Sequence, residues 1–259
     1  MTDLSFDDPC ILFALRRESR PFLQEFRPQQ RFPGAPCWAR FCGPAWLTVL
    51  ALETGVGRQR IEQTMSWLLG RPVLGNVPYG PRLVLAAGFA GALRQEHKVG
   101  DVILATEVVG PDGKCWPATW PPELPAGQWR PPLHRGRVLT VERLIADPAA
   151  KRSLGQQHGA LAVDMESSVV ADHCARHGVP FGCVRGISDD VHTPLSPRLV
   201  SLLADGRVSA LRTAGALLRA PRLAREFWRL ARDTKFAAGQ LSKALGELLT
   251  LTLPFGADL

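Results

Sequence analysis

The sequence predicts a single-domain α/β fold in which a mixed, mostly parallel sheet is flanked by helices, with an extra basic helix at the C-terminus. Three features carry this prediction. Short apolar segments alternate along the chain with segments of helical pattern. Several of these segments are apolar on both faces, as parallel strands covered by helices are. Beyond residue 221, leucines and arginines recur at helical spacing on two faces.

The composition fits a folded chain that attracts anions. Of its 259 residues, 46% are hydrophobic and 21% are charged, which allows a sizeable core and argues against disorder of the whole chain. The formal net charge of +7 favours an anionic binding partner: phosphate, nucleic acid or an acidic membrane surface. A protein with many surface arginines explains the charge equally well. No uncharged apolar stretch reaches the ~20 residues that span a bilayer, so we expect no membrane-spanning segment.

The cysteines and the N-terminus predict a cytoplasmic protein. Six cysteines are present, without a CxxC pair or a regular spacing, which is typical of reduced thiols. The N-terminus does not resemble a secretory signal, because its first apolar run is short and is followed at once by Arg16 and Arg17. Histidines and cysteines lack the spacing of zinc ligands, so no metal site is predicted.

The first half of the chain contains apolar segments separated by small or polar residues. Residues 10–15 predict a buried strand, and residues 16–19 a polar loop or the start of a helix. A glycine turn leads into residues 45–53, which predict a helix. Residues 83–87 predict a second strand that ends in a turn of small residues at 88–91.

The second half alternates strands and helices around one long loop. Residues 110–135, rich in proline and tryptophan and without a period, predict the loop. A glycine at position 178 predicts the end of a helix that begins near Glu166. The remaining predicted elements are strands at 102–109, 137–141, 160–163 and 181–185 and a helix at 148–157.

Three carboxylates follow predicted strands and mark a candidate site. They are Glu18, Glu166 and Asp189, and ligands of such sheets bind beyond the carboxyl ends of the strands. Carboxyl groups suit the cleavage of a nucleoside C–N bond. This reaction needs a proton on the leaving base, groups that hold the cationic sugar, and a positioned nucleophile. Taken singly, a carboxylate after a strand is more often a helix cap or a turn residue. The spacing alone does not separate these interpretations.

Several blocks of the sequence resemble the nucleoside phosphorylase/nucleosidase superfamily. They are residues 85–93 with 99–102, residues 162–166, residues 178–181 and residues 184–189. The most similar members are the methylthioadenosine/S-adenosylhomocysteine nucleosidases and the hopanoid-associated phosphorylases. The resemblance covers about residues 10–195 in order. It implies a nucleoside phosphorylase-like catalytic domain over residues 1–200, with residues 201–259 as a helical segment packed on it.

The resemblance implies a role for each matching residue on the base and sugar side. Asp189 matches the acid that protonates or hydrogen-bonds N7 of a purine, beside Ser188. Met165 and Glu166 match the pair that holds the ribose, with Glu166 on the sugar hydroxyls. The base is expected to pack on an apolar wall formed by Leu144 and Ile145.

The nucleophile side departs from the family in two respects. Glu18 matches the glutamate that orients the attacking water, and Ala87 and Gly88 belong to the same pocket. Phe89 stands where nucleosidases carry a small hydroxyl residue. Arg16 and Arg17 stand where acidic residues are usual, and arginines suit phosphate as a co-substrate, unless they are merely exposed loop charges. Glu18 favours water, so hydrolysis and phosphorolysis both stay open, with hydrolysis preferred because a carboxylate repels phosphate. No other cofactor is expected.

The segment after Pro221 predicts a long helix with an apolar and a basic face. The apolar face contains Leu223, Phe227, Leu230, Ala237, Leu241, Leu245 and Leu248, and the basic face contains Arg222, Arg225, Arg229, Arg232 and Lys235. One interpretation is a terminal helix packed on the core or on a partner subunit. The other is a helix that rests on an anionic inner membrane surface. Nucleic acid is not expected, since aromatic residues are not interleaved with the charges.

The resemblance leaves two function classes open. The first is an enzyme, a purine nucleosidase or phosphorylase and by analogy a homodimer, acting on a 5′-thioadenosine-type nucleoside or on an adenosyl lipid. Three tryptophans in the long loop, Trp116, Trp120 and Trp129, are compatible with a greasy 5′ substituent. The second is a binding module that retains the fold without turnover, which Phe89 favours if its ring fills the nucleophile pocket.

Overall fold

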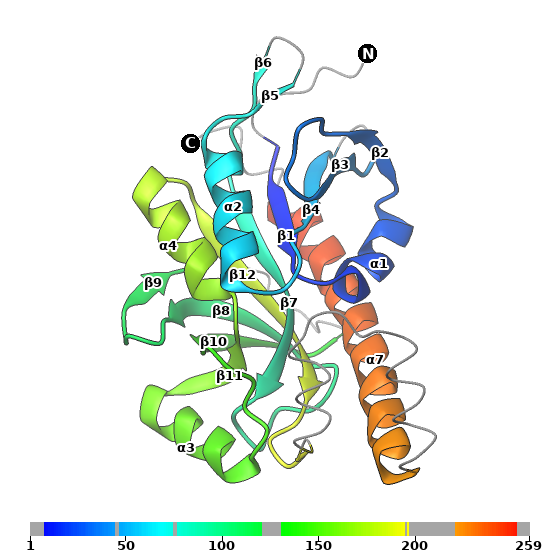
Figure 1. Cartoon of the computed structure of the whole chain (residues 1–259), viewed down its shortest axis with the longest axis vertical. Coiled ribbons are helices and arrows are strands. Elements are labelled where there is room, and N and C mark those ends of the chain that lie inside the picture. The colour runs from blue at the N-terminus through cyan, green and yellow to red at the C-terminus, as the bar shows by residue number, and fades with distance from the viewer. Residues whose placement is uncertain are drawn as a thin grey trace.

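One large sheet runs through the whole molecule (Figure 1). The computed structural model describes residues 8–44, 47–74, 77–120, 131–194, 196 and 221–252. Within these residues the sheet has the strand order β11-β10-β8-β12-β7-β1-β4-β3-β2, with β9 paired to β8. Its strands are β1 (Cys10–Phe13), β2 (Pro28–Arg31), β3 (Trp38–Cys42), β4 (Val49–Glu53), β7 (Val84–Ala92), β8 (Val102–Val109), β9 (Cys115–Pro117), β10 (Leu133–Thr140), β11 (Ala160–Asp164) and β12 (Phe181–Asp189). A separate hairpin pairs β5 (Val73–Leu74) with β6 (Val77–Pro78).

Parallel pairs form the middle of the sheet. Strand β1 lies between β4 and β7, and β12 runs parallel to β7, while β10 runs parallel to both β8 and β11. Antiparallel pairs join β8 to β12 and add β3 and β2 at one end. Strand β11 also pairs with β7 near Gly91 and Ala92. This last pairing closes five strands into a ring, which leaves the site-bearing strands without an open edge.

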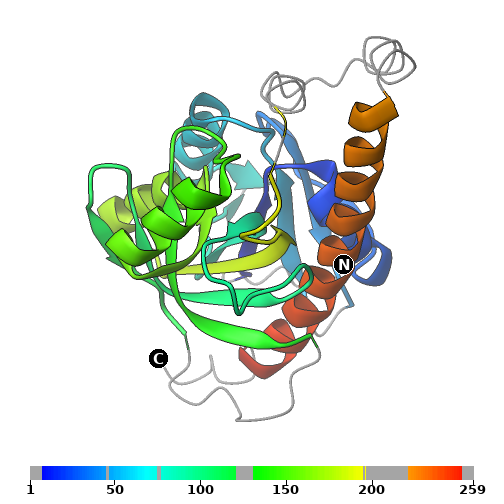
Figure 2. The same cartoon turned by 90° about the horizontal axis from the view of Figure 1, so that it is seen from below.

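Helices cover both faces of the sheet (Figure 2). On one face, α2 (Arg58–Leu69) and α4 (Ser167–His177) pack over a cluster that contains Leu50, Val84 and Ile103. On the other face, α1 (Arg16–Glu25) and α7 (Pro221–Thr252) pack over Ile11 and Leu104. The helix α3 (Pro148–His158) lies beside β11. The prediction of a single α/β domain with a mixed sheet and flanking helices is confirmed.

The predicted helix over residues 45–53 is wrong. Residues 49–53 form β4, which pairs with β1 on one side and β3 on the other, and residues 45–46 lie outside the described part. Val49, Leu50, Ala51 and Leu52 are all fully buried. A short segment that is apolar all round has no period, so its sequence does not distinguish a buried strand from a buried helix. The helix α2, which follows β4, was not predicted.

The predicted turn at residues 88–91 is strand, and the strand predicted at residues 181–185 is longer than expected. Strand β7 continues through residues 88–91 to Ala92, and β12 continues beyond Arg185 to Asp189, because the two strands pair along almost their full length. Glycine lowers strand propensity, and pairing with neighbouring strands overrides that local preference here. The predicted loop at 110–135 contains β9 and the start of β10, and its residues 121–130 lie outside the described part.

The other predicted elements are confirmed. The predicted strand at 102–109 is β8, the helix at 148–157 is α3, and the polar residues after β1 begin α1. Helix α4 ends at Gly178, whose φ of 66° is the left-handed conformation that glycine adopts without strain. The long helix after Pro221 is α7.

Helix α7 has the two faces that the sequence predicts. Its C-terminal half is anchored in the core by Ala237, Leu241, Leu245 and Leu248. The side chains of Arg225, Arg229, Arg232 and Lys235 are exposed, while those of Arg222 and Leu223 lie outside the described residues. Within the described part of the chain, no helix is long and apolar enough to cross a bilayer. All six cysteines have free thiols.

Candidate active site

A cavity of about 230 Å³ opens where β7, β11 and β12 end. Its walls also include residues of α1, α3 and α7 and of the segment between β10 and α3. Nine of the predicted site residues line it: Arg17, Glu18, Phe89, Leu144, Ile145, Met165, Glu166, Ser188 and Asp189. Ala87 and Gly88 do not line the cavity; Ala87 is buried in the core. Residues far apart in the sequence therefore meet around one cavity, as the carboxyl ends of neighbouring strands allow.

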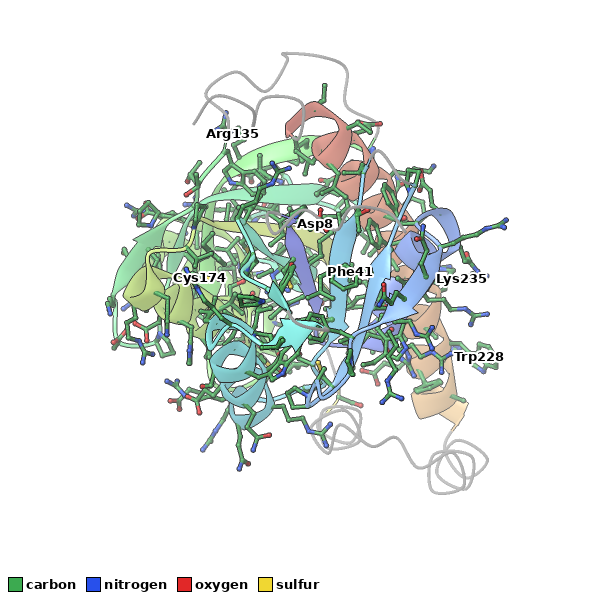
Figure 3. The ribbon with its side chains drawn as sticks, turned by 90° about the horizontal axis from the view of Figure 1, so that it is seen from above. Asp8, Phe41, Arg135, Cys174, Trp228 and Lys235 are labelled. Atoms are coloured by element: carbon green, nitrogen blue, oxygen red, sulfur yellow. The ribbon has the colours of Figure 1, made fainter. Side chains whose placement is uncertain are left out.

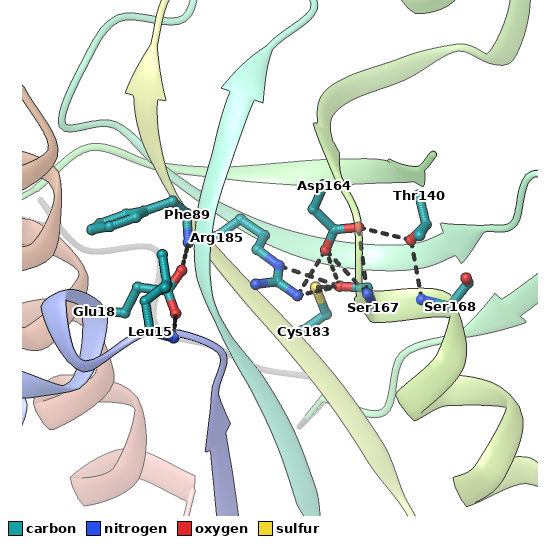
Figure 4. Close-up of polar contacts among 9 residues, drawn as sticks. All are labelled: Leu15, Glu18, Phe89, Thr140, Asp164, Ser167, Ser168, Cys183 and Arg185. Carbon is teal, nitrogen blue, oxygen red and sulfur yellow. Dashed lines mark hydrogen bonds and ion pairs between the residues drawn. The ribbon is translucent and has the colours of Figure 1, made fainter. Parts of the chain in front are cut away.

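Glu18 is fixed on the α1 side of the cavity. Its Oε2 accepts a hydrogen bond from the backbone N–H of Leu15 (2.8 Å), so it caps the first turn of its own helix. Its Oε1 accepts from the backbone N–H of Phe89 on β7 (2.9 Å; Figure 4). The side chain is almost fully buried, and this burial raises the pKa of Glu18, against the lowering effect of these hydrogen bonds. Glu18 is thus both a helix cap and a carboxylate held at the cavity.

A buried arginine lies behind Glu18. Arg185 on β12 is only 3% exposed, and its Nη2 lies 2.7 Å from Oδ2 of Asp164 at the end of β11. The guanidinium also donates hydrogen bonds to the hydroxyl of Ser167, which bonds in turn to Asp164 (Figure 4). A Cβ at Gly88 would collide with Nη1 of Arg185 and lie 2.8 Å from Oε1 of Glu18. Gly88 therefore contributes by leaving room for this arginine and this carboxylate.

Met165 and Glu166 follow β11 and face the cavity together. Both are partly buried, and Glu166 is the residue that precedes α4. Burial raises the pKa of Glu166 to about 7, and the negative charge of Asp164 adds to the effect, while Arg185 opposes it. Near neutral pH both the protonated and the ionised form of this carboxyl group are therefore populated. Such a group can donate or accept a hydrogen bond with a hydroxyl-bearing ligand.

Asp189 has hydrogen-bond partners on both oxygens. Its Oδ1 accepts from the hydroxyl of Ser188 (2.9 Å), and its Oδ2 accepts from the ammonium of Lys151 on α3. Lys151 is fully buried and also donates to the backbone oxygen of Asp190 (2.9 Å). The Asp189 side chain is 14% exposed. A buried cation thus holds an accessible carboxylate, an arrangement that fixes the carboxylate in the cavity wall and keeps a proton close to it.

The cavity wall is largely apolar between the two carboxylate groups. Leu144 and Ile145 lie in the segment between β10 and α3, and Val141 and Val163 lie beside them. The half-buried ring of Phe89 lines the cavity near Glu18. An apolar cavity with a few convergent polar groups is the usual form of a small-molecule site.

Arg17 and Arg16 differ in their relation to the site. Arg17 is exposed and lines the cavity, whereas Arg16 is exposed but is not part of the lining. Of the two arginines predicted as candidates for binding phosphate, Arg17 therefore lies at the rim of the cavity and Arg16 does not.

Sequence reasoning missed several contributors to the site. Lys151 lies in a helix whose pattern gives no sign that a lysine points inward. Arg185 had a signal, because it is a charged residue in the otherwise apolar segment of β12. Leu230 and Thr234 of α7 also line the cavity, so the C-terminal helix is part of the site as well as of the basic surface.

Known proteins resemble this chain in sequence. A 5′-methylthioadenosine/S-adenosylhomocysteine nucleosidase of Bacillus cytotoxicus is 26% identical over 163 residues, which cover 54% of this chain and 68% of the relative. The nucleosidase of the same name from Exiguobacterium sp. is 27% identical over 165 residues, covering 55% of this chain and 68% of the relative.

Solved structures share the fold over nearly the whole chain. A Helicobacter pylori 5′-methylthioadenosine nucleosidase mutant with 5′-methylthioadenosine in its active site superposes with a TM-score of 0.68 at 18% identity, covering 95% of this chain and 99% of the other. Futalosine hydrolase of the same organism superposes with a TM-score of 0.67 at 17% identity, covering 95% and 98%. The sequence model of the phosphorylase superfamily matches residues 40–220, well over half of the chain. This chain belongs to the phosphorylase superfamily.

Proposed function

We propose that this protein is an enzyme that cleaves the N-glycosidic bond of an adenine nucleoside, with water as the nucleophile. The observation that carries the proposal is the placing of two carboxylate systems around one cavity. Asp189 with Lys151 forms one, and Glu18 with Glu166 forms the other. The sequence relatives that are nucleosidases support the same class of reaction.

On the base side, Asp189 acts on N7 of the purine. As the C–N bond breaks, its electron pair moves to the base, and a proton on N7 makes the base a better leaving group. The ammonium of Lys151, which donates a hydrogen bond to Asp189, supplies this proton through the carboxylate, and Ser188 keeps Asp189 oriented. Val141, Leu144 and Ile145 offer the flat base an apolar wall.

On the sugar side, the negative charge of the carboxylates stabilises the positive charge that develops on the ribose. Glu166 accepts hydrogen bonds from the ribose hydroxyls, and Met165 packs on the sugar. Water attacks the anomeric carbon while Glu18 accepts the proton that the water loses. Free adenine and the free sugar leave, and solvent returns a proton to the Asp189–Lys151 pair and removes the one from Glu18.

Glu18 supports hydrolysis over phosphorolysis. A buried carboxylate at the nucleophile position repels a phosphate dianion, and Arg17 at the rim is exposed, so its attraction is screened by solvent. We propose a 5′-thioadenosine-type nucleoside or an adenosyl lipid as substrate. Leu230 on α7, together with Val56 and Leu15, supplies apolar surface for a 5′ substituent.

A panel of adenosyl compounds tests the proposal. Purified protein is incubated with adenosine, 5′-methylthioadenosine, S-adenosylhomocysteine and a 5′-alkyl adenosine, each with and without phosphate, and products are followed by mass. We expect free adenine and free sugar, at a rate that phosphate does not raise. Ribose 1-phosphate formed only with phosphate would replace hydrolysis by phosphorolysis, and no adenine from any compound would contradict enzymatic cleavage.

Phe89 supports a second candidate, a nucleoside- or lipid-binding module without turnover. Its ring lines the cavity, and its backbone N–H donates to Oε1 of Glu18, the carboxylate proposed to position the nucleophile. Calorimetric binding of adenine with no product after hours would favour this module. The variant Phe89→Ser separates the two cases. If the Phe89 ring blocks the site, removing the ring produces cleavage that the wild type lacks. If the wild type is already an enzyme, cleavage does not depend on removing the ring.

We also propose that the protein is a cytoplasmic homodimer that rests on the inner membrane surface through α7. Arg225, Arg229 and Lys235 are exposed on this helix, and Trp228 projects from it with 71% exposure (Figure 3). Basic and aromatic side chains together are typical of interfacial helices. Cosedimentation with anionic but not with zwitterionic vesicles is expected, and it should weaken in an Arg225→Ser/Arg229→Ser variant. The molar mass from light scattering tests the dimer.

A further inference from the structure

Two histidines and an aspartate meet outside the cavity. Asp101 is the residue before β8, His134 lies near the start of β10, and His97 belongs to the turn that leads from β7 into β8. None of the three lines the cavity of the candidate active site. Since β8 and β10 are parallel neighbours, with Ile103 opposite His134, the sheet itself brings the carboxylate and the second imidazole together.

Three imidazole nitrogens of this cluster lack hydrogen bonds. His97 is 4% exposed, and neither of its ring nitrogens has a hydrogen-bond partner among the described residues. The Nε2 of His134 is also buried without a hydrogen bond there. A buried polar nitrogen without a hydrogen bond is unfavourable. A neutral imidazole offers one nitrogen lone pair, so a ligand that accepts lone pairs would satisfy one nitrogen of each histidine.

The arrangement of the three side chains suits a metal ion. The His134 Nε2 lies 3.4 Å and the His97 Nδ1 4.0 Å from Oδ2 of Asp101, and one ligand atom from each residue lies within 4.8 Å of the others. A zinc ion about 2.1 Å from each ligand atom holds them roughly 3.4 Å apart in tetrahedral geometry. The His134–Asp101 separation already has this value, and the other separations, which reach up to 4.8 Å, have to shorten when the ion binds.

We propose that His97, Asp101 and His134 form a binding site for one divalent transition-metal ion, such as Zn²⁺. Two imidazoles and one carboxylate are a donor set that first-row transition metals prefer over Mg²⁺ or Ca²⁺. Three protein ligands leave a fourth position for water. Asp101 also accepts a hydrogen bond from the backbone N–H of Lys98 (2.9 Å), which orients its carboxylate within the turn.

The ion has a structural consequence for β12. The backbone of Gly100 donates to the oxygen of Ile187 (2.9 Å), and Ile187 donates to the oxygen of Asp101 (2.9 Å). A metal that joins the 97–101 turn to β10 therefore also braces the end of β12. Ile187 lies two residues before Asp189. Because the ion binds the folded chain, it raises the free energy of unfolding.

Metal titration of the purified full-length protein tests the site. After treatment with EDTA and its removal, ZnCl₂ is titrated by calorimetry and CoCl₂ by visible absorption, and the melting temperature is measured with and without Zn²⁺. We expect one ion per chain, the absorption bands of Co²⁺ in a low-coordinate nitrogen and oxygen site, and a higher melting temperature with Zn²⁺.

The variants His134→Gln and Asp101→Asn give the decisive comparison, with His192→Gln, an exposed histidine outside the cluster, as the matched control. His134 is partly exposed, so its replacement leaves the core intact. We expect each cluster variant to weaken Zn²⁺ affinity more than tenfold and to lose the thermal shift, and the control to keep both. No binding by the wild type, or equal binding by the cluster variants, would overturn the site. Nucleosidase activity enters none of these readouts.

Discussion

At the scale of single residues, the site depends on how charged groups are paired. Lys151 is the clearest case, because its fully buried ammonium contacts Asp189 and the backbone of Asp190. Removing one partner of a buried ion pair leaves the other uncompensated. The sequence motif identifies Asp189, but the lysine that completes it comes from another helix, and no local pattern marks it.

Replacing Lys151 by methionine should lower kcat for adenine release by about 10²-fold, since the Asp189 pair loses its proton source. If the two residues act as a unit, Lys151→Met combined with Asp189→Asn costs little more than Asp189→Asn alone. Lys114→Met, which removes an exposed ion pair with Asp172, serves as the control. Additive losses in the double-mutant cycle would show that Lys151 acts only on stability.

Glu166 should make stability depend on pH. Its pKa of about 7 lies above the value of about 4.3 for an exposed glutamate, so the folded state binds this proton more tightly than the unfolded state. The free energy of unfolding is then unaffected by Glu166 below pH ~4, falls as the pH rises from ~4 to ~7, by roughly 4 kcal/mol at most, and levels off above that. Glu166→Gln should therefore raise the melting temperature at pH 8 and leave it unchanged at pH 4.5. An equal shift at both pH values would refute the assigned titration.

At the scale of elements, strand pairing determines the secondary structure of segments whose local sequence pattern is ambiguous. The sequence indicates most strands and helices, and it predicts Glu18, Glu166 and Asp189 at strand ends. It does not show that 49–53 is a strand, nor that β7 and β12 run on through their glycines, because those outcomes depend on neighbours far away in the sequence. Arg185 and α7 join the site for the same reason: their positions follow from tertiary packing.

Gly88 and Gly239 give opposite predictions for the same substitution. A methyl group at Gly88 in β7 collides with Arg185 and Glu18, so Gly88→Ala should destabilise the fold by about 1–3 kcal/mol and lower activity. Gly239 in α7 has open space where an added Cβ would lie, so Gly239→Ala should stabilise the helix by up to ~1 kcal/mol. Urea unfolding curves measure both. A stable, active Gly88→Ala variant would contradict the crowded geometry described for Glu18 and Arg185.

At the scale of the whole molecule, a closed ring of strands and a long C-terminal helix surround one cavity. The ring brings together the ends of β7, β11 and β12, and α7 connects the cavity wall to an exposed basic surface. The superfamily fold was predictable from a few motifs in order. The contribution of α7 to the cavity wall is not predictable in this way. Its sequence pattern shows which face of the helix is apolar, but it does not show which residues that face covers.

The central claim, Asp189 as the acid of adenine release, is tested most directly by the rate at which the Asp189→Asn variant releases adenine from 5′-methylthioadenosine. Asp172→Asn, on the surface of α4, is the matched control. The variant at Asp189 should fold, as circular dichroism can verify, and release adenine at least ~100-fold more slowly than the wild type, while the control remains within twofold. Equal rates for the wild type and Asp189→Asn would contradict the account.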